Sequence, residues 1–152
     1  MIKLCFLLLV LNSTLAMRNW ELIVEKGKLK IYRATKAKNG VYPIRSDYQA
    51  DFSLDEIREV LVAVDKKIRW VPTLKKITVL GRKSAMQWVE HALINVPWPC
   101  ADREIIYEVR QRNFPKEGKI IFDIKSVRDD YPIAKDHIRA HVYKSQIILS
   151  KD

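Results

Sequence analysis

The chain has 152 residues and a formal net charge of +10, from 28 Lys and Arg against 18 Asp and Glu. This length fits one domain that buries roughly two-thirds of its unfolded surface in a single core. Only 4 glycines are present, at turn-like positions, which excludes a Gly-rich phosphate loop. The apolar run near the N-terminus is far too short to span a bilayer, and no other stretch is long enough.

Residues 1–16 have the order of a secretory signal. Met1–Lys3 gives a short basic start, Leu4–Leu11 is an unbroken apolar run, and Thr14–Ala16 ends in a small residue. This order predicts cleavage after Ala16 and a domain over residues 17–152 that is exported to the periplasm or secreted. A buried N-terminal strand or helix, or an uncleaved anchor, is the alternative.

The excess positive charge is scattered along the chain rather than gathered in one block. Its sum attracts anionic surfaces, and for an exported protein an anionic membrane surface is the favoured partner. An ordinary basic surface is the alternative. Nucleic acid is not expected as a partner, because Trp88 and Trp98 stand in apolar strand contexts rather than on a basic stacking platform.

The first elements are predicted from local patterns. Residues 17–26 (MRNWELIVEK) predict a short helix that ends at Gly27. Residues 27–36 alternate apolar and basic side chains, which predicts a strand with one wet face. Asn39-Gly40 predicts a tight turn, and residues 44–52 predict the next strand.

A helix is predicted to begin at Ser53, where Glu56 completes a capping box. Its apolar side chains recur at spacings of three and four: Leu54, Ile57, Leu61, Val64 and Ile68. Pro72 ends it shortly after Trp70. A stripe of this kind is typical of core packing and carries no chemistry by itself.

The remainder reads as strands joined by short turns. The predicted strands are residues 76–82, 85–96, 103–112, 119–127 and 137–150. Successive strands joined in this way pair antiparallel, so we expect an α+β fold with a curved antiparallel sheet wrapped against a helix. His137 and His141 would stand too far apart on a strand to share one ion, and no metal or other cofactor is expected.

Arg103 opens a strand directly after the Pro97–Pro99 turn and shares a face with Tyr107. If that face lines an apolar interior, the cation needs a partner, because a buried unpaired charge costs several kcal/mol. Glu90, on the same face as Trp88 of the preceding strand, is a candidate, and so is Asp102. Such a pair can orient the polar group of a lipid, or it can be purely structural.

The enzymatic signal is thin. The sequence contains no nucleophile elbow and no zinc-protease motif. Asp102 with Glu104, or Asp129 with Asp130, can be imagined as an acid–base pair, but each is explained more simply as part of a turn or a solvated rim. No catalytic residue is therefore predicted.

Several of these features together resemble the START family of lipid-transfer domains. The resemblance covers about residues 17–152 and rests on motifs scattered along that length. They are Trp20, Asp65 with Trp70, the Pro97-Trp98-Pro99 turn followed by Arg103 and Glu104, and Ile138-Arg139.

The resemblance implies a helix-grip fold, in which an antiparallel sheet curves round a long C-terminal helix and a hydrophobic tunnel holds one sterol, phospholipid or similar molecule. These domains are binders and carriers, not catalysts. In some sterol-binding members a buried acid–arginine pair contacts the ligand; Arg103 matches the arginine by motif, and Glu90 matches the acid more loosely. The expected ligand-binding residues are Arg103, Glu90, Trp88, Tyr107 and Trp98.

The sequence departs from the family pattern at its end, because SQIILSKD stops near the penultimate strand. We therefore expect a C-terminally shortened domain, either a fragment or a chain whose open apolar face is covered by a second copy or a partner. The oligomeric state and the ligand are left open. Two alternatives to lipid binding remain: a helix-grip enzyme of the polyketide cyclase or dehydrase type, and a basic exported interaction protein.

Overall fold

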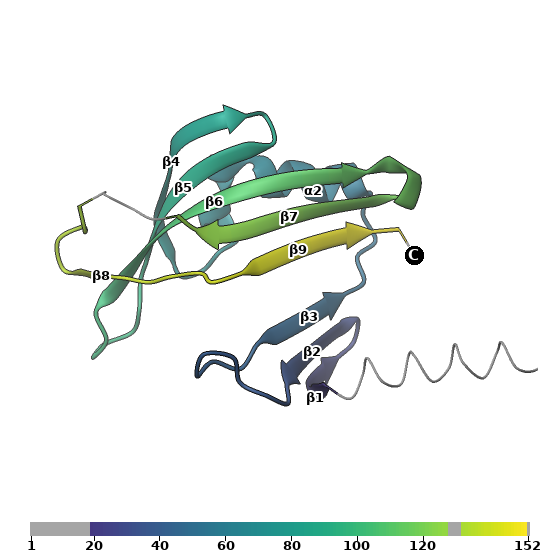
Figure 1. Ribbon diagram of the computed structural model, residues 1–152, viewed down its shortest axis with the longest axis horizontal. Helices are drawn as coiled ribbons and strands as arrows, with labels where there is room; N and C mark the ends of the chain where they lie inside the picture. The colour runs from purple at the N-terminus through teal and green to yellow at the C-terminus, as the bar shows by residue number, and fades with distance from the viewer. Residues whose placement is uncertain (1–18, 128–131, 152) are drawn as a thin grey trace, which may run out of the picture. The chain divides into compact units, whose positions relative to one another are not determined.

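A computed structural model of the chain describes residues 19–127 and 132–151 (Figure 1). The chain divides after Asp51 into two compact units, called here the N-terminal unit and the C-terminal unit. The predicted signal at residues 1–16 lies outside the described residues. Among those that are described, no helix is long and apolar enough to cross a membrane.

The N-terminal unit is a three-stranded antiparallel sheet of β1 (Trp20–Lys26), β2 (Leu29–Ala34) and β3 (Ile44–Tyr48), in that order. The helix expected over residues 17–26 is wrong, since most of this segment is β1. It contains several side chains that favour strands, and β2 supplies hydrogen-bond partners for its backbone. Gly27, with φ of 57°, belongs to the turn between β1 and β2 instead of ending a helix.

The predicted turn at Asn39-Gly40 is confirmed. Both residues have positive φ, 52° for Asn39 and 75° for Gly40. The residues on either side, Lys38 and Val41, form a β-bridge with backbone hydrogen bonds of 2.8 and 3.1 Å. These are the conformations that Asn and Gly adopt at the lowest cost in a tight turn.

The C-terminal unit contains a helical segment followed by strands. Its helical elements are α2 (Leu54–Val62), η1 (Val64–Arg69) and η2 (Pro115–Glu117). Its strands are β4 (Leu74–Ser84), β5 (Gln87–Ile94), β6 (Asp102–Phe114), β7 (Lys119–Ser126), β8 (His137–Arg139) and β9 (Ser145–Ser150). The main sheet has the order β4-β5-β6-β7-β9 with antiparallel neighbours, which confirms the predicted curved antiparallel sheet.

The single strand expected over residues 137–150 is instead two. β8 pairs parallel with the start of β6, and β9 pairs antiparallel with β7. Residues 140–144 between them carry no strand. Apolar alternation continues through this stretch, but alternation alone does not specify which neighbour a strand pairs with.

The helix begins as predicted. The Ser53 Oγ accepts from the N–H of Glu56 at 3.2 Å, and the Glu56 carboxylate accepts from the N–H of Ser53 at 2.8 Å, which is the capping box. The α-helix ends earlier than expected, because Ala63 leaves the helical region with φ of −77° and ψ of 75°. The chain continues as the 3₁₀ turn η1.

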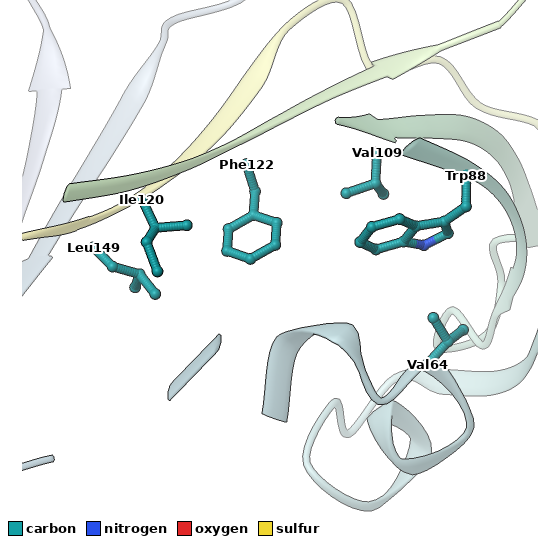
Figure 2. Close-up of a cluster of buried hydrophobic side chains, with 6 residues drawn as sticks. All are labelled: Val64, Trp88, Val109, Ile120, Phe122 and Leu149. Carbon is teal, nitrogen blue, oxygen red and sulfur yellow. The ribbon is translucent and has the colours of Figure 1, made fainter. Parts of the chain in front are cut away.

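The core of the C-terminal unit lies between this helical segment and the sheet. Figure 2 shows six buried side chains, of which Val64 comes from η1 and the rest from strands: Val64, Trp88, Val109, Ile120, Phe122 and Leu149. Leu54, Ile57 and Leu61 of α2 pack against this cluster, as the apolar stripe predicts. Ile68, expected on the same stripe, is 48% exposed.

A ligand cavity and two buried carboxylates

A cavity of about 230 Å³ lies in the C-terminal unit between the helical segment and the sheet. Its lining side chains from the helical segment and the turn after it are Leu61, Lys67, Trp70 and Val71. Those from the strands are Leu74, Ile77, Ala92, Ile94, Ile105, Tyr107, Val109, Phe122, Ile124 and Ile147. The wall is therefore apolar or aromatic except at the Lys67 ammonium and the Tyr107 hydroxyl.

Strand alternation explains why these side chains meet. β5 and β6 pair antiparallel, with Ala92 opposite Ile105 and Glu90 opposite Tyr107. Residues separated by two positions on a strand share a face, so both pairs point to the same side of the sheet. Glu90 is therefore the one acidic side chain that β5 directs toward the helical segment.

Glu90 is fully buried and receives hydrogen bonds from three side chains. The Lys67 ammonium lies 2.8 Å from each carboxylate oxygen. The Tyr107 hydroxyl donates to Oε2 at 2.7 Å, and the Trp88 indole N–H donates to Oε1. A buried carboxylate is tolerated when it is paired with a cation and its lone pairs are satisfied, and Glu90 meets both conditions.

The ion pair presents its cationic partner to the cavity. Lys67 and Tyr107 are lining residues, whereas Glu90 and Trp88 lie behind them in the wall. Burial, the nearby charge of Glu90 and the hydrogen bond to it all raise the pKa of Tyr107, so its hydroxyl stays protonated at neutral pH. An entering molecule thus meets an ammonium and a phenol at this point of the wall.

Glu90, one of the two candidate partners of Arg103, does not pair with it. Arg103 stands opposite Ile94 at the start of β6 and donates to the carbonyl of Ala101. Tyr107, which is opposite Glu90, is four residues further along β6, so Arg103 is about 13 Å away along the strand at roughly 3.3 Å per residue. Sharing a face did not bring the two charges together.

Asp102, the other candidate partner for Arg103, is also held elsewhere. Its carboxylate accepts from the N–H of Val96 at 3.0 Å and lies 3.4 Å from the Lys75 ammonium. The hydrogen bond from the Val96 N–H, with a further contribution from Lys75, lowers the pKa of Asp102. Its role is to close the loop between β5 and β6.

Trp98 is not a cavity residue, in contrast to the prediction. It is 92% exposed at the tip of the loop between β5 and β6. The loop is held by hydrogen bonds from the Cys100 N–H to the Pro97 carbonyl at 3.2 Å and from the Asn95 N–H to the Thr73 carbonyl at 2.8 Å. Trp98 is thus presented to solvent on a well-bonded loop.

Lys67 is the site residue that sequence reasoning missed. The expected α-helical stripe continued from Val64 to Ile68, but a 3₁₀ turn has three residues per turn. Residues three apart then share a face, which turns Lys67 inward beside Val64 and leaves Ile68 outside. Trp70, three residues further on, borders the cavity but is itself 46% exposed. The sequence signal that could have identified Lys67 is its position three residues after the core residue Val64. This spacing indicates a shared face only if the α-helix is known to end at Val62.

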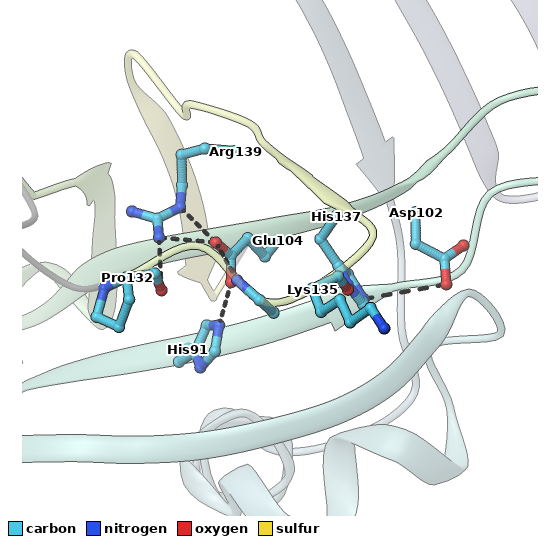
Figure 3. Close-up of polar contacts among 8 residues, drawn as sticks. His91, Asp102, Glu104, Pro132, Lys135, His137 and Arg139 are labelled. Atoms are coloured by element: carbon cyan, nitrogen blue, oxygen red, sulfur yellow. Dashed lines mark hydrogen bonds and ion pairs between the residues drawn. The ribbon is translucent and has the colours of Figure 1, made fainter.

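A second fully buried carboxylate, that of Glu104, lies on the opposite face of β6 (Figure 3). Its Oε1 accepts from Arg139 Nε at 3.0 Å and Nη2 at 2.7 Å, and from the Ala134 N–H at 3.2 Å. Its Oε2 lies 2.9 Å from His91 Nε2. Burial alone would raise the pKa of Glu104, but these hydrogen bonds outweigh it and the pKa is lowered.

Glu104 joins two of the motifs on which the family resemblance rests. The acid after the proline turn and the arginine of Ile138-Arg139 form one ion pair, which holds β8 against the start of β6. This cluster faces away from the cavity side of the sheet, because Glu104 and Ile105 are adjacent on the strand. It fixes residues 132–139 and takes no part in lining the cavity.

Comparison with known proteins supports the fold. No protein-family model matches the chain. The chain is similar to the ceramide transfer protein of Cricetulus griseus, at 22% identity over 138 residues, which is 85% of this chain and 23% of that protein. It is also similar to the human phosphatidylcholine transfer protein, at 23% identity over 145 residues, 93% of this chain and 67% of that protein. The chain thus spans about a quarter of the ceramide transfer protein.

Solved structures give the same result. A STAR-related lipid transfer protein from Xanthomonas axonopodis superposes with a TM-score of 0.78 at 20% identity, covering 88% of this chain and 75% of that one. Human STARD10 superposes with a TM-score of 0.77 at 15% identity, covering 90% of this chain and 58% of that one. The START-like fold predicted from the motifs is confirmed.

Proposed function

We propose that this START-like chain binds a lipid or another hydrophobic small molecule in the cavity of its C-terminal unit, without catalysis. The observation that carries the proposal is the cavity itself, whose wall is apolar except for a lysine and a tyrosine beside one buried carboxylate. Apolar lining with a few fixed polar groups is typical of small-molecule sites.

The size of the cavity indicates how much of a ligand it holds. Its volume of about 230 Å³ is below the range of roughly 300–1,000 Å³ that encloses a drug-sized ligand. A cavity of this size encloses only part of a lipid.

The titratable groups of the wall favour binding over acid–base catalysis. Among the described lining residues these are Lys67 and Tyr107. Lys67 is engaged by Glu90, and the raised pKa of Tyr107 keeps its hydroxyl protonated. A general base poised near neutral pH, which a cyclase or dehydrase would need, is not offered by this pair.

Native mass spectrometry tests the proposal directly. The full chain is incubated with lipid vesicles, re-isolated and sprayed, and we expect a protein mass with one added lipid. Ala92→Phe fills the cavity and should remove the adduct, whereas Leu93→Phe, the adjacent residue on the opposite face of β5, should retain it. Wild-type protein that always emerges without lipid would contradict the proposal.

We also propose that the chain exchanges its ligand at an anionic membrane, with Trp98 as the contact. A tryptophan that is 92% exposed on a bonded loop suits the membrane interface, and the net charge of +10 attracts acidic headgroups. Export of the chain remains part of this proposal, since the membrane would then be an extracytoplasmic one.

Vesicle sedimentation tests the membrane contact. Trp98→Ala should weaken binding to phosphatidylserine-containing vesicles about tenfold, because burying a large apolar side chain contributes roughly 1.5–3 kcal/mol. Tyr48→Ala is the matched control, since Tyr48 is 68% exposed on β3. Equal losses from both variants, or binding that does not depend on salt, would contradict the proposal.

A further inference from the structure

Among the described residues that line the cavity, one carries a charge, and its charged group is the ammonium of Lys67. We propose that the ligand's buried polar group is an uncharged hydrogen-bond acceptor, such as an ester or amide carbonyl, and that Lys67 donates to it. This inference rests on the proposed function and specifies the class of ligand. It differs from the expectation that a pair of Arg103 and Glu90 contacts the ligand.

The acid is already saturated. A carboxylate has about four lone-pair positions, and Glu90 uses them on two contacts from Lys67 and one each from Trp88 and Tyr107. Glu90 is also 0% exposed and is not a lining residue. A ligand hydroxyl or N–H could reach it only by displacing one of these donors.

The lysine retains a donor. An ammonium has three N–H groups, and the two 2.8 Å contacts to Glu90 account for two of them. The third has no partner among the described residues. The Lys67 side chain is 13% exposed and is a lining residue, so this N–H is the donor that remains for a molecule in the cavity.

The charge balance selects an uncharged acceptor. Lys67 and Glu90 compensate each other, and no other charged side chain lines the cavity among the described residues. A carboxylate or ammonium that entered would be a third charge without a counter-ion, which is costly in an apolar site. A carbonyl avoids this cost and still accepts a charge-assisted hydrogen bond.

A ligand series of constant chain length tests the inference on the full chain near neutral pH. Methyl laurate, laurate and dodecylamine each compete with diphenylhexatriene, a fluorescent probe without charge or polar groups. We expect the ester to displace the probe at about tenfold lower concentration than either charged ligand. Equal displacement by laurate and the ester would overturn the inference.

The probe separates this inference from the proposed function. If diphenylhexatriene does not bind the wild-type chain, the cavity does not accept hydrophobic molecules and the proposed function fails. If the probe binds and is displaced without discrimination among the three ligands, the proposed function stands and the role of Lys67 fails.

Glu90→Gln tests the inference by changing the preference of the cavity for methyl laurate over laurate. It removes the negative charge and leaves Lys67 as a net positive charge in the wall, so laurate should gain about tenfold relative to the ester. Glu108→Gln removes one negative charge from the opposite face of β6, beside Lys83, and should leave the preference unchanged. An unchanged preference in folded Glu90→Gln would overturn the inference.

A charge-balanced variant covers the case in which Glu90→Gln does not fold. The double variant Lys67→Met with Glu90→Gln removes both charges and keeps the apolar stem of residue 67. In competition with diphenylhexatriene we expect methyl laurate to have an advantage over dodecane in the wild type, and the double variant should lose that advantage. Retention of that advantage would show that Lys67 is not the donor.

Discussion

The two buried glutamates differ in what surrounds them, and this decides their roles. Glu90 has a lysine that borders the cavity, so its ion pair is next to any ligand. Glu104 on the other face is enclosed by Arg139, His91 and the Ala134 N–H, none of which lines the cavity. We therefore assign ligand contact to the first cluster and structural support to the second.

Glu104→Gln tests the structural role. We expect it to lower the free energy of unfolding by about 3 kcal/mol at neutral pH, because it disrupts a buried ion pair. Glu108→Gln, on the same face of β6, involves a partner, Lys83, that is 66% exposed and should cost less than about 1 kcal/mol. Urea unfolding measures both, and equal losses would contradict the assignment.

The loss of stability in Glu104→Gln should depend on pH in a defined way. The folded state lowers the pKa of Glu104 below its usual 4.5, so the carboxylate stabilises the fold above that value and loses this contribution as the pH falls through the folded-state pKa. The difference in unfolding free energy between wild type and Glu104→Gln should therefore shrink as the pH falls from neutral to below 4.5 and then through the folded-state pKa. A difference that stays constant over this range would contradict the role of the ionised carboxylate.

At the residue scale the sequence predicted the acid and missed its cation. Strand alternation correctly placed Glu90, Trp88 and Tyr107 on one face, since that needs only a period of two. It could not choose between Arg103 on the neighbouring strand and Lys67 on the helical segment. That choice depends on how the helical segment packs on the sheet, which no local pattern specifies.

At the scale of elements, the capping box positions the helical segment that carries Lys67. Ser53→Ala removes the side-chain acceptor for the Glu56 N–H and should cost about 1 kcal/mol of stability. Amides of α2 should also exchange faster with solvent, because a frayed first turn opens locally. Ser145→Ala, at an exposed position in β9, is the control and should stay within about 0.5 kcal/mol of wild type.

Equal effects of the two serine substitutions would contradict this role of the cap. Unchanged exchange of the α2 amides in Ser53→Ala would do the same, since it would show that packing alone holds the first turn.

Element prediction succeeded where a local rule is sufficient and failed where pairing decides. The cap at Ser53 and the turn at Asn39-Gly40 were correct because side-chain chemistry determines them within four residues. The prediction of a helix over residues 17–26 is wrong, because a short mixed segment becomes a strand through a partner strand that lies beyond a turn. The single strand predicted over residues 137–150 is two strands for the same reason, since β8 and β9 pair with different neighbours.

At the scale of the whole molecule, burial is unevenly divided between the units. The buried hydrophobic side chains all belong to the C-terminal unit, and no described residue of the N-terminal unit, residues 19–51, is buried. A small sheet without a buried face cannot offset the conformational entropy of ordering its chain. The N-terminal unit therefore has little stability of its own.

Hydrogen exchange of the full chain measures this difference. Amides of β1, β2 and β3 should open with free energies well below those of β5 and β6, because local opening follows buried apolar contact. The comparison is internal to one sample, so it needs no variant and is not affected by expression or purification. Equal protection of the two sheets would contradict this prediction. It would show that the N-terminal strands are stabilised by contact with a surface outside their own sheet, and not by packing within it.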